Sequence, residues 1–250
     1  MPHSPSGETV TSRALRVLAT FSAQRRELTL SDLARLTGLP LTTTHRLVGE
    51  LATWGALERD EQGLYRIGLR LWEIAALAPR SVGLREAALP FLEDLYEATH
   101  ENVHLAVRDG DEALYVERIS GRHAVSVVSR VGGRLPLHAT GVGLVLLAYA
   151  DVEVQERVMA GPLRRFTDRT VTSPPELRRL LAEVRRTRTA ISPGYLENNA
   201  LSVAAPVWGP AGDVVAALSI VVPISRAPGP FLPAVTAAAR GVSRALGARL

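Results

Sequence analysis

Apolar side chains recur at helical spacing along the first part of the chain. They mark one face of a predicted helix over residues 10–21, namely Val10, Ala14, Val17, Leu18 and Phe21. A second helix is predicted from Ser31, which is a good N-cap, to Gly38, which is suited to end it. A third is predicted to begin near Thr42 and to run towards Trp54. Two short helices joined by a glycine-containing turn are typical of a helix-turn-helix motif.

The period changes after Gly55. Residues 56–59 and 64–67 flank a turn-rich tetrapeptide, a pattern that predicts a β-hairpin. Helices followed by a hairpin make a winged helix-turn-helix, which we place at residues 9–72. Residues 1–8 are polar and lack the charged and apolar regions of a secretion signal, so we expect a disordered tail there.

A further apolar helical stripe covers residues 84–99, where Pro90 is expected to kink or divide the helix. We assign residues 73–99 to linker helices. From residue 102 onwards strand patterns dominate, and we predict strands at 103–107, 113–119, 125–129, 202–207 and 214–222, with helices at 140–149, 151–159, 175–188 and 230–248. Short turns between successive strands favour an antiparallel α+β domain over residues 100–250.

Composition removes several classes of function. The 250 residues are 46% hydrophobic and 22% charged, enough for a real core, and no cysteine is present. Disulfides, thiolate zinc sites, iron–sulfur clusters and a cysteine nucleophile are therefore excluded. Because no apolar run approaches the length of a membrane span, we expect a cytoplasmic protein with no membrane partner.

The charge is basic but evenly spread. All 29 basic residues are arginine and the net charge is +4. Residues 1–80 hold ten arginines and eight acids, and residues 81–250 hold nineteen and seventeen. The charge therefore does not single out the helix-turn-helix, and the interpretation as a DNA-binding domain rests on residue spacing.

The spacing resembles that of the IclR family of bacterial transcription regulators. The similar segments are LSDLA (30–34), GLP (38–40), TTHRL (43–47), YRIG (65–68), THENVHLAV (99–107), LPLHATG (135–141), VAAPV (203–207) and VAALS (215–219). The resemblance implies a GAF-like fold for the effector-binding domain at residues 100–250. It also implies binding to double-stranded operator DNA as a homodimer or homotetramer, and more often repression than activation.

The exposed start of the third predicted helix is the candidate DNA reader. Hydroxyl and guanidinium groups there can reach base edges and phosphates in the major groove. The candidates are Thr42, Thr43, His45 and Arg46, supported by Arg35 and Arg66, with Arg25, Arg26 and Arg59 as further phosphate contacts. The alternative is an ordinary solvated helix face.

The resemblance also implies an effector pocket. Its lining would comprise Leu135, Gly141, Val142, Ser192, Ser202, Ser219 and Val221. The chain departs from the family signature, because Arg188, Tyr195, Leu144 and Val221 stand where glycine, glutamate, lysine and serine are usual. We therefore expect a less polar pocket that binds an aromatic or other partly apolar carboxylic acid. Ordinary core packing is the alternative for each residue.

One motif points to an enzyme instead. His100, Glu101 and His104 form an H-E-x-x-H sequence, the pattern of zinc hydrolases. The segment leads into a predicted strand, where residues four apart are separated by about 13 Å. Glu117 and His123 are the nearest candidates for a third ligand. We expect no metal, no cofactor and no catalytic residue, and keep two alternatives: this zinc hydrolase, and a DNA-binding scaffold whose second domain only oligomerises.

Overall fold

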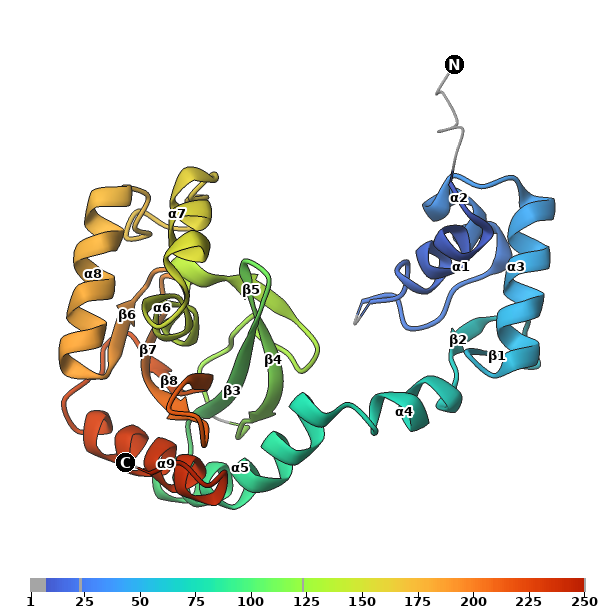
Figure 1. The fold of residues 1–250 in the computed structure, drawn as a ribbon. Coiled ribbons are helices and arrows are strands. Elements are labelled where there is room, and N and C mark those ends of the chain that lie inside the picture. The colour runs from blue at the N-terminus through green and yellow to red at the C-terminus, as the bar shows by residue number, and fades with distance from the viewer. Residues whose placement is uncertain (1–7, 23, 123, 250) are drawn as a thin grey trace. The chain divides into compact units, whose positions relative to one another are not determined.

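The computed structural model describes residues 8–22, 24–122 and 124–249, which fall into two units divided between Pro79 and Arg80 (Figure 1). No helix in these ranges is long and apolar enough to cross a membrane. The first unit contains α1 (Val10–Leu18), α2 (Leu30–Thr37), α3 (Leu41–Trp54), β1 (Leu57–Arg59), β2 (Tyr65–Ile67) and α4 (Leu69–Ala75).

The first unit is a winged helix-turn-helix, as the sequence predicts. Its helices and the antiparallel β1–β2 hairpin close around one apolar core. The buried members of that core are Val17, Leu28, Leu33, Val48, Leu57 and Tyr65. The three helices α1, α2 and α3 and the hairpin all contribute to this core. One face of α3 is buried in it, and the opposite face is exposed to solvent.

The cap of α2 differs from the prediction. Thr29, and not Ser31, is the N-cap, and its hydroxyl accepts a hydrogen bond from the Asp32 amide at 3.1 Å. The Asp32 carboxylate in turn accepts one from the Thr29 amide at 3.4 Å, which completes a capping box. The helix ends at Gly38, whose φ of 69° is the left-handed conformation that glycine allows.

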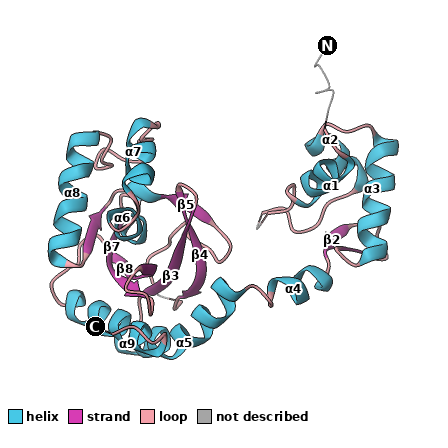
Figure 2. Ribbon diagram, viewed as in Figure 1, coloured by secondary structure: helices cyan, strands magenta, loops and turns pink. Residues whose placement is uncertain are grey.

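The second unit is an antiparallel α+β domain, also as predicted (Figure 2). Its elements are α5 (Pro79–Thr99), β3 (Asn102–Asp109), β4 (Glu112–Ile119), β5 (Arg134–Pro136), a 3-10 turn (Leu137–Ala139), α6 (Gly141–Ala148), α7 (Val152–Ala160), α8 (Pro174–Thr187), β6 (Ala190–Pro193), β7 (Ala200–Trp208), β8 (Val214–Pro223) and α9 (Phe231–Ala245). The six strands lie in the order β5-β4-β3-β8-β7-β6.

The two faces of this sheet are covered differently. One packs against α5 and α9 through branched apolar side chains such as Val203 and Ile220. The other packs against α6 and α8, and its inward side chains under α6 are small: Ala106, Ala190, Ala204 and Ala217. Small side chains let the fully buried helix α6 approach the sheet closely. We call this second side the α6 face.

A β-bulge in β4 changes which of its side chains point to each face of the sheet. Leu105 pairs with Glu117, but the next residue of β3 pairs with Tyr115, so Val116 is the extra residue. Arg118 pairs with His104, and both therefore lie on the α6 face together with Tyr115. Glu117 is turned to the opposite face, where its carboxylate accepts a hydrogen bond from Arg85 of α5 at 2.5 Å.

Some predicted elements are wrong. Residues 125–129 are not a strand, because their carbonyl groups serve side chains: Val125 O accepts from Asn102 Nδ2 at 2.7 Å and Ser129 O from Arg118 Nη1 at 2.6 Å. Pro90 does not divide α5, which continues to Thr99 while its apolar stripe packs on the sheet. The linker helices placed at 73–99 correspond to α4, which begins earlier at Leu69, and to α5, which packs on the sheet of the second unit. The short strands β5 and β6 were not predicted.

Candidate functional site

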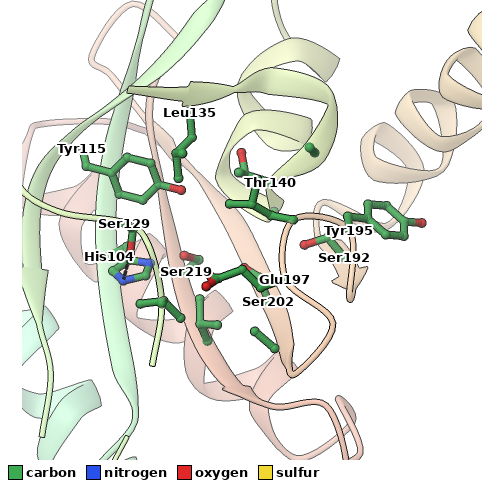
Figure 3. A pocket seen from close by; sticks show the side chains of 16 residues that line it. His104, Tyr115, Ser129, Leu135, Thr140, Ser192, Tyr195, Glu197, Ser202 and Ser219 are labelled. Carbon is green, nitrogen blue, oxygen red and sulfur yellow. Dashed lines mark hydrogen bonds between the residues drawn. The ribbon is translucent and has the colours of Figure 1, made fainter. Parts of the chain in front are cut away.

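A cavity lies on the α6 face, beside the first turn of α6 (Figure 3). It is open to solvent on one side, and the atom-free space within it, open solvent included, is about 410 Å³. Side chains reach it from β3, β4, β5, β6, β7, β8 and two loops. The lining residues are His104, Tyr115, Val127, Ser129, Leu135, Ala139, Thr140, Gly141, Ser192, Tyr195, Leu196, Glu197, Ala200, Ser202, Ser219 and Val221.

The structure brings most of the predicted pocket residues together at this cavity. Those that line it are Leu135, Gly141, Ser192, Ser202, Ser219 and Val221. Val142 does not line it and packs into the apolar core instead. It follows Gly141 in α6, and each residue of a helix is turned by about 100° from the one before.

The cavity is more polar than the sequence led us to expect. His104, Tyr115, Ser129 and Glu197 were not predicted to line it. His104 was recognisable by strand alternation, because it stands two residues before Ala106 on the same face of β3. No local signal places Glu197, which lies in the loop between β6 and β7, two residues after the position where the family glutamate was expected.

One end of the cavity is formed by Gly141, Ser192 and Ser202, which we call the serine end. Ser192 and Ser202 are cross-strand partners on β6 and β7, so their hydroxyls share the α6 face. A Cβ atom at Gly141 would lie 2.5 Å from Ser202 Oγ and 3.3 Å from Ser192 Oγ. Only glycine therefore lets the helix start this close to the two hydroxyls.

The amide groups of the first turn of α6 add to the serine end. Thr140 caps the helix, and its hydroxyl accepts from the Gly143 amide at 3.1 Å. The earlier amides of a helix have no partner within it, and the helix dipole favours negative charge at this place. The serine end thus combines hydroxyl and amide donors suited to a carboxylate.

The opposite end is formed by His104 and Ser129, which we call the histidine end. Figure 3 shows these two side chains across the cavity from Ser192. His104 Nε2 lies 3.0 Å from Ser129 Oγ, and its ring meets Tyr115 edge-on at 5.4 Å between centroids. Burial, aided by the charge of Arg118, lowers the pKa of His104 to about 3. The imidazole is therefore neutral at physiological pH.

Ser219 carries an unused polar group between the two ends. Its side chain is 1% exposed, and its Oγ has no hydrogen-bond partner among the described residues. Buried polar atoms are almost always hydrogen-bonded in native proteins, so this hydroxyl is available to a polar group that enters the cavity. The hydroxyl lines the cavity, so such a group would meet it there.

Glu197 is half-buried and lines the cavity. Its Oε2 accepts a hydrogen bond from the Val128 amide at 3.2 Å, which ties the β6–β7 loop to the segment that carries Ser129. Desolvation raises the pKa of this carboxyl, while the Val128 hydrogen bond and the charge of Arg118 act in the opposite direction.

The H-E-x-x-H segment is divided between a helix and a strand. It spans the end of α5 and the start of β3, with His100 at a φ of 55° between them. No three histidine, aspartate or glutamate side chains in the described part of the chain are placed to hold a metal ion. His104 is engaged with Ser129 instead, and His123 lies outside the described residues.

The predicted DNA-binding residues lie on the first unit. Thr42, His45 and Arg46 are exposed near the start of α3, and Thr43 is half-buried. Together with the exposed Arg35 and Arg66, these residues are called the DNA-binding face below.

Each predicted arginine of the DNA-binding face already holds a carboxylate. Arg46 pairs with Glu50 at 2.7 Å, Arg35 with Asp32 at 2.9 Å and Arg66 with Glu58 at 3.0 Å. Exposed ion pairs of this kind contribute only about 0–1 kcal/mol. A phosphate can therefore replace the carboxylate at small cost.

The further candidates on this unit differ from each other. Arg25 and Arg26 are exposed. The Arg59 guanidinium lies 5.5 Å from the centre of the Tyr65 ring, a cation–π arrangement within the hairpin. Arg59 is therefore partly engaged in holding its own hairpin.

Comparison with known families gives a consistent result over nearly the whole chain. A model described as the IclR helix-turn-helix domain matches residues 10–61. A second, described as the bacterial transcriptional regulator IclR C-terminal domain, matches residues 77–247.

Individual relatives agree with the family models. The chain is 35% identical over 216 residues to the HTH-type transcriptional regulator XynR of Escherichia coli (strain K12), covering 86% of each protein. It is 34% identical over 194 residues to the regulator KipR of Bacillus subtilis (strain 168), covering 77% of this chain and 78% of KipR.

Solved structures give the same answer. A crystal structure of an IclR homologue complexed with 4-hydroxybenzoate, from Microbacterium hydrocarbonoxydans, is 42% identical and superposes with a TM-score of 0.93 over 96% of this chain and 99% of the homologue. An IclR homologue from Microbacterium sp. strain HM58-2 is 40% identical, with a TM-score of 0.64 over 97% and 100% of the two chains.

Proposed function

Because the chain belongs to the IclR family of bacterial transcriptional regulators, we propose that it is a repressor controlled by an aromatic carboxylic acid bound in the cavity of its second unit. Its relatives are DNA-binding regulators with a helix-turn-helix and an effector domain, so its function is regulation of transcription and not catalysis. The proposal concerns the effector, the residues that bind it and the sign of the response.

The main support for the effector is the cavity itself. Its lining combines apolar walls with hydroxyls, and the buried Ser219 hydroxyl has no partner among the described residues. A homologue 42% identical to this chain is complexed with 4-hydroxybenzoate. A domain that served only as a scaffold would not need a cavity lined by hydroxyls and a carboxyl group.

The two ends of the cavity suggest how such an acid would lie. Its carboxylate would accept hydrogen bonds at the serine end, from Ser192, Ser202 and the first-turn amides of α6. Its ring would lie between apolar side chains of the wall, such as Leu135 and Val221.

We propose that the DNA-binding face contacts the operator. The start of α3 would enter the major groove, where Arg46 and the exposed hydroxyls can reach base edges. Arg35 and Arg66 would contact phosphates after releasing Asp32 and Glu58. A regulator that acts on chromosomal operators works in the cytoplasm.

We propose that the protein acts as a homodimer or homotetramer. Helix α4 presents apolar side chains to solvent in the first unit, and Leu77 follows it. Leu69, Trp72, Ile74 and Leu77 are between 46% and 79% exposed. Several large apolar side chains exposed close together in sequence are typical of an interface, and two helix-turn-helix units are needed for a palindromic operator.

A direct experiment combines DNA selection with ligand titration. Operator DNA is selected from a random library with the full-length protein, and its affinity is measured by fluorescence anisotropy with and without 4-hydroxybenzoate. We expect a 5- to 150-fold loss of affinity, about the usual range of allosteric coupling. Calorimetry should give one 4-hydroxybenzoate per chain. Absence of heat and an unchanged operator affinity would refute the proposal.

A further inference from the structure

The charges that face the cavity are unusual for a site that binds an acid. Among the described residues that line it, Glu197 is the only one with a carboxyl group, and none is an arginine. His104 is held neutral by burial. A carboxylate ligand therefore meets one carboxyl group and no cationic side chain from this lining.

Only one oxygen of the Glu197 carboxylate accepts a hydrogen bond from the described residues. Oε2 accepts the Val128 amide hydrogen bond, whereas Oε1 accepts none from the described part of the chain. Arg118 influences Glu197 only at a distance, because its Nη1 and Nη2 donate to Ser129 O and Asn102 Oδ1. Glu197 is thus a partly desolvated acceptor that forms no ion pair with the described residues.

The position of this acceptor is tied to the histidine end. Val128 precedes Ser129, whose hydroxyl bonds His104, so the Val128–Glu197 hydrogen bond places the carboxylate beside that segment. The donors suited to an effector carboxylate lie at the serine end instead. The two ends are therefore complementary to different groups, an anion at one and a hydrogen-bond donor at the other.

We propose that Glu197 determines effector specificity by accepting a hydrogen bond from a hydroxyl group that the effector carries at the end opposite its carboxylate. This rests on the proposed function, since it assumes an aromatic acid in the cavity. The effector class becomes hydroxylated aromatic acids, and aromatic dicarboxylates are rejected because their second carboxylate would face Glu197.

The physical reason for strong discrimination lies in Glu197 itself. An acid without the hydroxyl would displace water from a carboxylate and leave it with no donor in return. Sites built to hydrogen-bond a substrate group reject analogues that lack it far more strongly than apolar pockets reject a missing methylene.

The test compares three probes by calorimetry on the full-length protein: 4-hydroxybenzoate, benzoate and 4-methoxybenzoate. We expect 4-hydroxybenzoate to bind at least about tenfold more tightly than the other two, the value of one hydrogen bond to a charged group. In Glu197→Leu this preference should disappear, while benzoate binds no more weakly than to the wild type.

A matched variant at the other end separates specificity from general damage. Ser202→Ala should weaken 4-hydroxybenzoate and benzoate by the same factor, because both carry the carboxylate that the serine end accepts. Thermal unfolding and operator binding of each variant show that it is folded.

Three outcomes are decisive. Equal binding of 4-hydroxybenzoate and benzoate to the wild type overturns the role of Glu197 and leaves the aromatic-acid effector standing. An equal loss of both acids in Glu197→Leu does the same. If the wild type binds none of the three acids, the proposed effector class itself fails, and the role of Glu197 fails with it.

Discussion

On the DNA-binding face each predicted arginine already holds a carboxylate, whereas in the cavity Ser219 and Glu197 keep hydrogen-bonding capacity unused. The surface pairs are exposed, so water and counter-ions can replace either partner. Ser219 is buried and Glu197 half-buried, so an unmet hydrogen bond costs more there than at the exposed surface pairs. Binding to DNA would therefore exchange the carboxylate partner of each arginine for a phosphate. Binding of an effector would instead supply hydrogen bonds that Ser219 and Glu197 do not have with the described residues.

The largest effect expected from this comparison concerns His104 and pH. Its pKa is about 3 in the folded protein against 6.5 for an unperturbed histidine, because burial disfavours the charged form. The unfolded chain therefore binds the proton first as pH falls. The stability due to a neutral His104 is full above pH 6.5 and declines by about 1.4 kcal/mol per pH unit below it.

The measurement is the free energy of unfolding by urea at several pH values between 4.5 and 7.5. His104→Gln keeps a hydrogen-bonding group near Ser129 but cannot titrate, so its stability should fall less steeply with acidification than that of the wild type. Parallel slopes for the two proteins would show that His104 is not held neutral by its surroundings.

An intermediate effect is expected on the DNA-binding face. Arg46→Ala should weaken binding to the selected operator by about 1–3 kcal/mol, since it removes a base or phosphate contact. The matched control is Arg70→Ala, which breaks a similar exposed pair with Glu73 at 2.9 Å in the same unit, outside the predicted contact residues. Equal affinities of the two variants, measured by fluorescence anisotropy, would contradict the assignment of α3 as the reader.

The smallest expected effect is on the stability of variants at two buried serines that differ in their hydrogen bonds. Ser219→Ala should raise the stability of the ligand-free protein by about 1 kcal/mol, because it removes a buried hydroxyl that has no hydrogen-bond partner among the described residues. Ser243→Ala should lower it by a similar amount. Ser243 Oγ donates to Ala239 O at 2.6 Å and accepts from the Trp208 amide at 2.9 Å. Thermal unfolding of both variants checks this, and a loss of stability in both would show that Ser219 has a partner.

Much of the fold was predictable from local patterns. The helical stripe through Val17, the turn at Gly38 and the hairpin around residues 60–63 all depend on residues close together in sequence. The strand predicted at residues 125–129 shows what local patterns miss. Residues 125–129 have the composition of a strand, yet Asn102 and Arg118 bind their carbonyl groups from more than ten residues away.

The candidate site was predicted less completely than the fold. Ser192, Ser202 and Ser219 were found because the family resemblance extends to the strands that carry them. His104 was found only as half of a metal motif, and Glu197 not at all. His104 faces the cavity because β3 pairs with β4 and β8, which are distant in sequence, and Glu197 lies in a loop that is hydrogen-bonded to Val128.

The sequence by itself determined the two-part organisation, the helix-turn-helix and the antiparallel character of the second unit, because periodicity and turns are local properties of the chain. Only the tertiary structure decided which polar groups share a cavity and which of them lack a partner. The bulge at Val116 turns Arg118 onto the face of His104, and a loop brings Glu197 to Val128. Hydrogen-bond satisfaction in a buried site depends on atoms far apart in the sequence, so no local pattern encodes it.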